Sequence, residues 1–392
     1  MTDEILIIGG GFAGFWAAMA ARRVAEDRAR VTMVSREPVM QMRPRLYEAN
    51  PESLGADLLP LLDTAGVSFV QGDATGLDLA GHTVAFASGA ILPFARLVVA
   101  TGSTMRRPPV PGAEKAHAID SQDDAIAFDR RLAEIARGVA RPSVAVVGAG
   151  FTGIELALEL RDRIALHGGD AESLRIVLVD RTATVGAELG AGPRPEIEAA
   201  LAAAKVECRL GETVIALAAD RVTFADGPAL AADAVVLTTG MVASGFVRHV
   251  PGDRDALGRI VVDRSLRAPA APEVFVTGDA AAADTGDGHR ALQSCQHALQ
   301  LGRFAGENAA RDLLGLPTMP YAQPRYVTCL DLGRSGAVLT EGWDRTVSKT
   351  GDEAKALKRR INTVVIYPPA NVPGATLLAL SSIDPAEQRL PG

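Results

Sequence analysis

Two glycine-rich stretches of the chain have the residue types and the spacing that hold the phosphates of a dinucleotide. GGGFAG at 9–14 and GAGFTG at 148–153 both fit the pattern G-x-G-x-x-G. The first glycine of this pattern permits a tight turn, the second lets the backbone approach a pyrophosphate, and the third lets the next helix pack closely. Each copy follows an apolar strand and opens a helix, which is the context that the motif needs. Two copies predict two bound nucleotides; two tight turns without a ligand are the alternative.

The strand after each glycine turn is expected to end in a group that binds the adenosine ribose. In the second unit, RIVLVD ends at Asp180, 32 residues after Gly148. A carboxylate there accepts hydrogen bonds from both ribose hydroxyls and repels a 2′-phosphate, so it favours NADH over NADPH. Arg181 follows and could tolerate a phosphate, which keeps NADPH open.

The first unit departs from this rule, because its second strand ends in Ser35, where an acid is expected. The hydroxyl of Ser35, or the carboxylate of Glu37, is the candidate for the ribose of the first nucleotide, with Arg36 over the adenine. Ser35 and Arg36 together would also suit a 2′-phosphate. The remaining alternative is that Arg36 and Glu37 form only a solvated turn.

Short apolar runs along the chain predict buried parallel strands. They lie at 5–8, 31–34, 97–100, 144–147 and 176–179, with two more at 234–240 and 274–279. Helical patterns at 14–25 and 153–163 follow the glycine turns, and strands that alternate with helices predict an α/β fold with parallel sheets. Beyond Pro320, the stretch 326–340 has the pattern of strand, turn and strand, and 351–362 that of a helix, which predicts a small α+β tail domain.

Composition and charge narrow the class of protein. The 392 residues carry a net charge of −7, so nothing points to nucleic acid or an anionic membrane as the main partner. The three cysteines, Cys208, Cys295 and Cys329, are too far apart for a disulfide framework and favour a reducing cytoplasm. The apolar run 5–21 is not expected to be a signal peptide, because acidic residues precede it. The histidines and cysteines show no metal-ligand spacing, and no metal site is predicted.

Further motifs resemble the type II NADH dehydrogenase-like family of two-dinucleotide flavoproteins. LVVATGS at 97–103 is similar to the family's Ala-Thr-Gly segment beside the flavin, and VFVTGDAA at 274–281 to the segment whose aspartate, here Asp279, binds the ribityl chain of FAD. RPRLYEA at 43–49 resembles the family's Gln-Pro-Leu-Leu-Tyr run, which implies Pro44 near the isoalloxazine, with Arg43 in place of the glutamine. No cysteine precedes Cys208, so the redox dithiol of the related disulfide reductases is absent.

The resemblance also implies the catalytic residues. Glu155 matches the glutamate of the family's Thr-Gly-Val-Glu motif and would lie between nicotinamide and flavin; capping of its own helix is the alternative. CQHALQ at 295–300 resembles the Ala-Gln-x-x-x-Gln signature, so Gln296 and Gln300 would line the quinone entrance, with Cys295 in the alanine position. The two glutamines are four residues apart and share one helix face, where neutral amides can bind carbonyl oxygens; two ordinary surface glutamines are the alternative.

Two sets of cofactor-binding residues follow from the motifs and the resemblance. The FAD set is Gly9, Gly11, Phe12, Ala13, Gly14, Ser35, Arg36, Arg43, Pro44, Ala74, Ala100, Thr101, Gly102, Gly278 and Asp279. The NADH set is Gly148, Gly150, Phe151, Thr152, Gly153, Asp180 and Gly240.

The sequence therefore predicts two Rossmann-like dinucleotide-binding domains and a small C-terminal domain. The FAD domain spans 1–112 and 246–316, the NAD(P)H domain 113–245 and the C-terminal domain 317–392. The predicted activity is transfer of hydride from NADH to FAD and then of two electrons to a quinone-like acceptor. A soluble reductase of a ferredoxin-like partner, a tailoring enzyme whose anionic substrate meets Arg43 and Arg45, and an FAD/NADH redox-sensing protein are the alternatives.

The predicted location is the cytoplasm, as a monomer or homodimer. The apolar run 377–380 is short and Pro385 follows it, so no amphipathic anchor is expected there. The basic helix 355–360 is either a solvated face or a peripheral contact with the inner face of the membrane.

Overall fold

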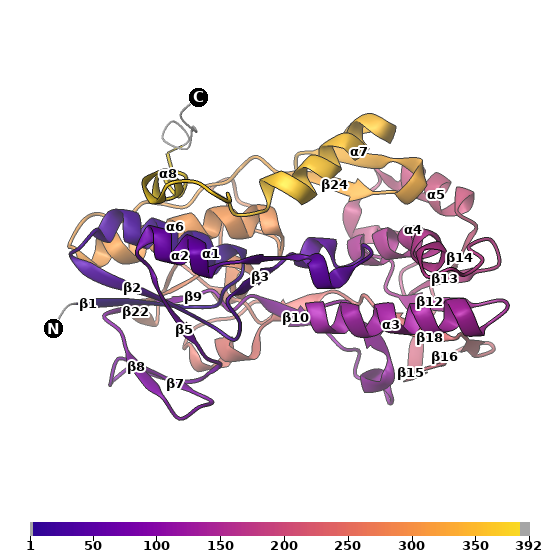
Figure 1. Ribbon diagram of the computed structural model, residues 1–392, viewed down its shortest axis with the longest axis horizontal. Coiled ribbons are helices and arrows are strands. Elements are labelled where there is room, and N and C mark those ends of the chain that lie inside the picture. The colour runs from indigo at the N-terminus through magenta and orange to yellow at the C-terminus, as the bar shows by residue number, and fades with distance from the viewer. Residues whose placement is uncertain (1–2, 385–392) are drawn as a thin grey trace.

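The computed structural model describes residues 3–384, and Figure 1 shows two α/β lobes side by side with the tail across the top. The first lobe is built on a six-stranded sheet of order β21-β22-β9-β1-β2-β5. Its strands are β1 (Asp3–Ile8), β2 (Ala29–Ser35), β5 (Ser68–Gln71), β9 (Arg96–Val99), β21 (Arg267–Ala268) and β22 (Ala271–Val276). All neighbours pair in parallel except β21 with β22, as the buried apolar runs predict.

The second lobe is built on a five-stranded, fully parallel sheet of order β11-β18-β12-β13-β14. Its strands are β11 (His117–Ala118), β12 (Ser143–Val147), β13 (Arg175–Asp180), β14 (Val206–Leu210) and β18 (Ala234–Leu237). Its helices are α3 (Gln122–Gly138), α4 (Phe151–Leu166) and α5 (Arg194–Ala203). The predicted α/β class is thus confirmed, while the predicted domain boundaries stay predictions and their last residues, 385–392, lie outside the described range.

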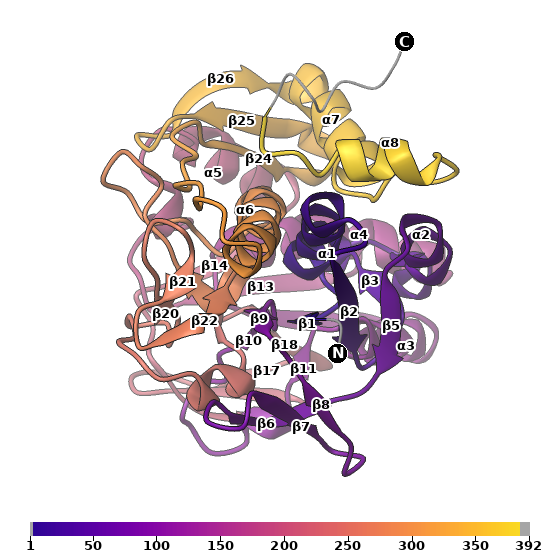
Figure 2. The same ribbon diagram turned by 90° about the vertical axis from the view of Figure 1, so that its left-hand side faces the viewer.

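Two helices that are far apart in the sequence pack against each other on one face of the first sheet. Figure 2 shows α1 (Phe12–Ala25) and α6 (Cys295–Leu313) side by side over this sheet, with α2 (Leu59–Ala65) next to them. A Cβ on Gly302 would lie 2.3 Å from the carbonyl oxygen of Ala13, and one on Gly306 would lie 2.0 Å from that of Ala17. The small residues therefore let the two helix backbones touch, which places the N-terminus of α6 beside the first glycine turn.

Small antiparallel sheets decorate both lobes and were not predicted. The larger ones are β6 (Ala74–Asp78), β7 (Thr83–Phe86) and β8 (Ile91–Pro93) on the first lobe, and β15 (Val214–Ala218), β16 (Arg221–Phe224) and β17 (Leu230–Ala231) on the second. Two antiparallel ladders pair β3 (Val39–Gln41) with β4 (Gly55–Asp57) and β10 (Ser103–Met105) with β19 (Met241–Ala243), and one parallel ladder pairs β20 (Ile260–Val261) with β23 (Ala281–Ala282). The β10–β19 ladder joins the two segments that link the lobes.

The tail forms the predicted strands and helix. It contains β24 (Val327–Asp331), β25 (Ala337–Glu341), β26 (Thr346–Thr350), α7 (Gly351–Arg360), a π-helical turn at Ile361–Val365 and α8 (Gly374–Ala379). Figure 1 shows this tail lying over both lobes, so that α7 faces the second lobe and α8 the first. Between residues 3 and 384 no helix has the length and apolar character needed to cross a bilayer; Pro385 lies outside that range.

Two predicted strands end earlier than expected because the chain turns for the site. The run 234–240 forms β18 only to Leu237, and the hydroxyl of the next residue, Thr238, donates to the carbonyl of Gly148 over 2.8 Å. The run 274–279 ends as β22 at Val276, and Gly278 then takes a positive φ of 63°. Both departures bring the end of a strand against a glycine turn.

Candidate functional site

The first and the third glycine of each turn cannot be replaced by a residue with a side chain. Gly9 and Gly148 have φ of 117° and 115°, in the region that favours glycine. A Cβ on either would lie 2.2 or 2.3 Å from a carbonyl oxygen of the neighbouring segment. A Cβ on Gly14 or Gly153 would lie 1.8 Å from the carbonyl oxygen of the first glycine of its own turn. Each turn thus presses the start of its helix against the strand that precedes it, as the motif predicts.

The second glycine of the first turn leaves the helix start open. Gly11 is the N-cap of α1 and no side chain caps this end of the helix. A Cβ built on Gly11 meets no atom of residues 3–384 within 4 Å. The first N–H groups of α1, from Phe12 onward, therefore face open space with the positive end of the helix dipole, which suits the pyrophosphate of a dinucleotide.

A half-buried polar cluster lies beside this opening and suits the hydroxylated chain of FAD. The hydroxyl of Ser103 donates to Asp279 Oδ2 over 2.7 Å, and Arg43 Nη1 donates to the Ser103 carbonyl over 3.1 Å. A Cβ on Gly278 would lie 2.8 Å from the Cβ of Ala13, so Asp279 sits at the start of α1. Burial raises the pKa of Asp279, against the opposing charge of Arg43. The predicted residues Ala13, Arg43, Gly278 and Asp279 are thus brought together, and they fit FAD.

Other predicted FAD residues surround the same turn. Pro44 lies with Arg43 in a short 3₁₀ turn, and Gly102 follows β9 with a φ of 68°. Ala100 contributes the carbonyl oxygen that approaches Gly9, and the Thr101 hydroxyl accepts from Ser244 over 2.7 Å. Ala100, Thr101 and Gly102 belong to the segment that leaves the carboxyl end of β9 in the first sheet, where open α/β sheets bind ligands.

The ribose end of the first unit is built around Ser35. A Cβ on Gly10 would lie 2.7 Å from Ser35 Oγ, and the Gly72 N–H donates to the Ser35 carbonyl over 2.9 Å. Ala74 begins β6 two residues further on, while Arg36 and Glu37 are both exposed. The structure thus places the Ser35 hydroxyl next to the glycine turn, while the side chains of Arg36 and Glu37 are on the surface.

The ribose end of the second unit is built around Asp180. Its Oδ2 accepts from the Ala149 N–H over 2.7 Å, and its Oδ1 accepts from both the N–H and the hydroxyl of Thr182 over 2.8 Å. A carboxylate oxygen has two acceptor directions, so one direction on Oδ2 remains for a ribose hydroxyl. Arg181 is exposed. Gly240, with a φ of 82°, accepts from the Arg106 N–H through its carbonyl, at the strand end next to the turn.

Glu155 forms a buried ion pair with Lys358 of α7. Lys358 Nζ lies 2.8 Å from Glu155 Oε1, and the two side chains are only 6% and 3% exposed. The Asp331 N–H donates to the same Glu155 oxygen over 2.9 Å. Burial raises the pKa of Glu155 to about 7, although Lys358 favours the ionised form. Burial disfavours the charged form of Lys358 as well, but Glu155 outweighs this effect and raises its pKa.

This arrangement corrects two expectations from the sequence. Glu155 does not cap its own helix, because the N-cap of α4 is Gly150 and no side chain caps it. Lys358 does not lie on a solvated face, although it belongs to the basic run 355–360. A signal for its burial was present: Lys358 follows buried Ala354 by four residues and so shares its helix face.

A charged cavity of about 400 Å³ is lined by Lys358, one partner of this ion pair, and not by Glu155. It is lined by Arg45, Tyr47, Glu48, Ala49, Asn50, Ser53, Leu54, Glu159, Asp331, Lys355, Lys358, Arg359, Asn362 and Thr363. Lys355 pairs with Asp331, and burial raises the pKa of Glu159 to about 7, with the charge of Asp331 adding to this effect. The cavity thus holds a carboxyl group, that of Glu159, that can exchange protons near neutral pH.

The two arginines offered to an anionic substrate already have partners within the protein, and that interpretation stays a prediction. Arg43 pairs with Asp120 and bonds to Ser103. Arg45 pairs with Glu48 over 2.7 Å and donates to the Tyr367 hydroxyl over 2.9 Å. Neither guanidinium is left without a partner of its own protein.

Gln296 and Gln300 are half-buried in the first turns of α6. Within residues 3–384 neither side-chain amide makes a hydrogen bond, so both stay available to an external carbonyl oxygen. Burial raises the pKa of the neighbouring Cys295 thiol, while the charge of Lys358 opposes this. Cys295 is therefore a poor nucleophile.

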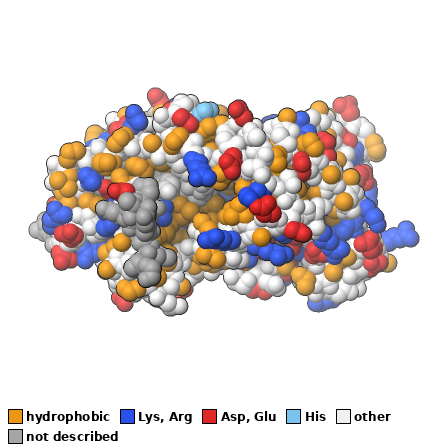
Figure 3. Space-filling model, turned by 90° about the horizontal axis from the view of Figure 1, so that it is seen from above, with side chains coloured by type: hydrophobic (Ala, Val, Ile, Leu, Met, Phe, Trp, Pro, Cys, Tyr) orange, Lys and Arg blue, Asp and Glu red, His pale blue; other side chains and the backbone are white. Residues whose placement is uncertain are grey.

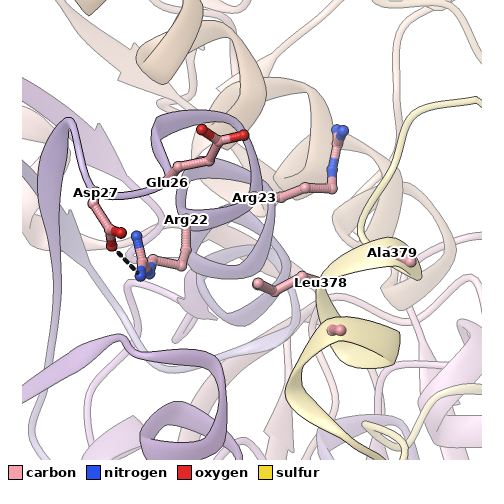
Figure 4. A pocket seen from close by; sticks show the side chains of 7 residues that line it. Arg22, Arg23, Glu26, Asp27, Leu378 and Ala379 are labelled. Atoms are coloured by element: carbon pink, nitrogen blue, oxygen red, sulfur yellow. Dashed lines mark hydrogen bonds and ion pairs between the residues drawn. The ribbon is translucent and has the colours of Figure 1, made fainter.

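A second pocket, of about 540 Å³, lies away from this site between the C-terminal end of α1 and α8. Figure 4 shows Arg22, Arg23, Glu26 and Asp27 on α1 and the loop after it, opposite Leu378 and Ala379 of α8. The glycine turn is at the other end of α1, so this pocket does not belong to the dinucleotide site. In the part of the chain that the structure describes, no three His, Cys, Asp or Glu side chains are grouped to hold a metal ion.

Comparison with known proteins identifies relatives of the whole chain. Residues 3–302 match the model of the pyridine nucleotide-disulphide oxidoreductase family. An NADH dehydrogenase-like protein of Mycobacterium tuberculosis is 42% identical over 391 residues, covering 97% of this chain and 98% of the relative. The demethylphylloquinone reductase NdbB of Synechocystis is 26% identical over 87% of this chain and 88% of its own. The fold is similar to that of NDH2 from Plasmodium falciparum in complex with NADH, with a TM-score of 0.78, 12% identity and 97% of both chains covered.

Proposed function

The chain belongs to the pyridine nucleotide-disulphide oxidoreductase family and, within it, to the NADH dehydrogenase-like proteins, and we propose that it is an FAD-dependent NADH:acceptor oxidoreductase with a quinone-like acceptor. The observation that carries this proposal is the Glu155–Lys358 pair. Lys358 Nζ lies 5.4 Å from the ring centre of Phe151, in the second glycine turn, and its charge also acts on Cys295 at the start of α6. The pair thus lies against the residue that begins the helix of the NADH cradle.

The chain's own residues bind and orient the reactants. FAD, when bound, supplies a two-electron carrier between NADH and the acceptor, so the protein contributes mainly positioning and electrostatics. The open start of α1 and the cluster of Ser103 and Asp279 hold FAD. The second glycine turn and Asp180 hold NADH. The amides of Gln296 and Gln300 donate hydrogen bonds to the carbonyl oxygens of the acceptor.

The acceptor half of the reaction also needs a proton from solvent. Reduction of a quinone by NADH converts NADH, one proton and the quinone into NAD⁺ and the hydroquinone. Glu155 is almost fully buried, so any proton that it exchanges with solvent must pass through other protein groups. Glu159, Asp331 and Lys355 line the same cavity as Lys358 of the pair, and Glu155 and Glu159 have pKa values near 7. A group with such a pKa is suited to proton transfer at neutral pH.

The half-reactions test this function separately. The purified protein is denatured to release and quantify FAD, and the native protein is then mixed with NADH without oxygen, followed by a short-chain quinone. Rapid bleaching of the flavin and rapid recovery with the quinone are expected. Bleaching without recovery would transfer the function to another acceptor, such as a ferredoxin-like protein. A persistent long-wavelength band without turnover would identify a redox sensor, and protein without flavin would contradict the proposal outright.

Contact with a membrane surface is the finer part of this proposal. Val364 and Val365, in the turn after α7, are 63% and 55% exposed, and Arg359 and Arg360 beside them are exposed too. Figure 3 looks onto the tail face and shows basic side chains among apolar ones. Such a surface suits an anionic bilayer, which would place the protein in the cytoplasm at the inner face of the membrane. Co-sedimentation with anionic but not neutral vesicles is expected, and Val364→Ser/Val365→Ser should reduce it; equal recovery with both vesicles contradicts the contact.

A further inference from the structure

The two glycine turns have the same backbone and differ in what faces their second glycine. Gly11 and Gly150 are both N-caps, with φ and ψ of −83° and −168° in one case and −82° and −167° in the other. A Cβ on Gly11 meets no described atom within 4 Å, whereas one on Gly150 would lie 2.5 Å from Glu188 Oε1. The Phe151 N–H, at the start of α4, donates to the same oxygen over 3.3 Å. A carboxylate of the protein thus occupies the second cradle, while the first is open.

A fixed loop aims Glu188 at this position. Glu188 lies in a 3₁₀ turn, Ala187–Leu189, and the N–H of Gly186 before it donates to the Ala149 carbonyl over 2.9 Å. Leu189 is buried, and a Cβ on Gly192 would lie 2.3 Å from the carbonyl oxygen of Arg345 in the tail. The loop is therefore held on both sides, and only the exposed Glu188 side chain can leave without moving backbone.

We infer that Glu188 is a built-in competitor of the NADH pyrophosphate: its carboxylate occupies the anion position at the start of α4 and leaves when the dinucleotide binds. The inference rests on the proposed function, because it takes the second turn as the NADH site. The open first turn suits FAD, which stays bound, whereas the second turn must release NAD⁺ in every cycle. Glu188 determines how tightly this second turn holds its dinucleotide.

The charges explain why the exchange works in both directions. The N–H groups and the dipole of a helix N-terminus favour a negative charge, and a pyrophosphate brings more charge and more acceptor oxygens than one carboxylate. The pyrophosphate therefore displaces Glu188, which turns into solvent. The carboxylate returns when NAD⁺ leaves, so the N–H groups and the partial positive charge at the start of α4 always face an anion. The result is weaker binding and faster release than an open cradle would give.

The test measures binding to the FAD-loaded protein by calorimetry, with ADP-ribose as the probe because it carries the pyrophosphate and no nicotinamide. Glu188→Gln removes the charge, and Glu188→Ala removes the side chain. Each is expected to bind ADP-ribose about fivefold more tightly than the wild type, in keeping with the strength of a charge at a helix end. Glu198→Gln, an exposed change of the same charge on α5, is the matched control and should leave the affinity unchanged.

Every outcome decides the inference. Unchanged or weaker binding of ADP-ribose by the Glu188 variants, with the wild type still binding, overturns it and leaves the proposed function intact. An equal gain in Glu198→Gln also overturns it, because the effect would then be one of net charge. Failure of the wild type to bind either ADP-ribose or NADH overturns the proposed function together with the inference.

Discussion

Lys358 of the tail and Glu155 of the second lobe form an ion pair of 2.8 Å that is almost completely removed from solvent. The charge of Lys358 is further enclosed by the rings of Tyr47 at 5.7 Å and Phe151 at 5.4 Å. These residues come from the first lobe, the second lobe and the tail, so one cation joins all three. We expect the pair to matter both for stability and for the reaction.

Removal of one partner should therefore be costly. Lys358→Met leaves Glu155 buried without its cation, and loss of one member of a buried pair typically destabilises a protein by about 3–5 kcal/mol. The double variant Lys358→Met/Glu155→Leu removes both charges and should recover most of this loss. The free energy of unfolding from urea titration measures both. A double variant as unstable as the single one would contradict the pairing as the cause.

Periodicity and turn residues were sufficient to predict the core of the fold. The runs at 5–8 and 144–147 became β1 and β12, because continuous β-branched and aliphatic residues fit strands buried on both faces. The helix α3 was missed, although Ser121 and Asp124 form a capping box at its start, a signal readable from sequence. The small antiparallel sheets were missed because their strands have two to five residues and carry too little pattern.

The site was predictable where a local motif defines it and not where distant segments meet. The glycine turns and Asp180 could be selected from the sequence, because each lies at the end of a strand that faces the ligand edge. Asp279 was selected from the resemblance of its segment to that of a known family. Lys358 could not be assigned to Glu155, since only the folding of the tail over the second lobe brings them together. Glu188 has no motif of its own, and its place in the cradle depends on the loop conformation.

The first glycine turn offers a matched pair of substitutions. Gly11→Ala meets no protein atom at a negative φ, so the fold should tolerate it, but its methyl group enters the space of the pyrophosphate. This variant should be as resistant to urea as the flavin-free wild type while retaining little FAD. Gly9→Ala, at a φ of 117° and 2.2 Å from a carbonyl oxygen, should fail to fold instead. Full FAD occupancy in Gly11→Ala, read from the visible spectrum, would remove the turn from the flavin site.

Asp180 is expected to carry much of the NADH affinity. Asp180→Ala removes a charged acceptor of a ribose hydroxyl and also frees the Ala149 N–H, which donates to it over 2.7 Å. Hydrogen bonds to charged groups contribute about 1.5–3 kcal/mol, so NADH should bind roughly 10- to 100-fold more weakly. FAD content is the internal control and should not change. Titration of NADH against the variant checks this, and an unaltered dissociation constant would exclude Asp180 from the site.

Gln300 should act on the acceptor and not on the donor. Gln300→Trp fills the half-buried face of α6 beside Gln296 with a ring that cannot reproduce the amide. Reduction of the flavin by NADH should keep its rate, whereas reoxidation by a short-chain quinone should slow by at least tenfold. Stopped-flow measurements resolve the two half-reactions in one sample. Equal slowing of both would mean that the acceptor pocket lies elsewhere.

Glu159 should make the stability of the protein depend on pH near neutrality. Burial raises its pKa from 4.5 to about 7, so between these values the folded state binds more protons than the unfolded state. The free energy of unfolding must then fall as the pH rises through this window, because burial disfavours the charged carboxylate that deprotonation produces. Glu159→Gln removes this contribution, so its urea midpoint should fall less steeply between pH 5 and pH 8 than that of the wild type.

Glu172→Gln is the control for this measurement. Lys205 lowers the pKa of exposed Glu172, so its titration lies below this range and the slope should stay as in the wild type. An unchanged slope in Glu159→Gln would show that Glu159 titrates as an ordinary glutamate, and the cavity would lose its proton-exchanging group.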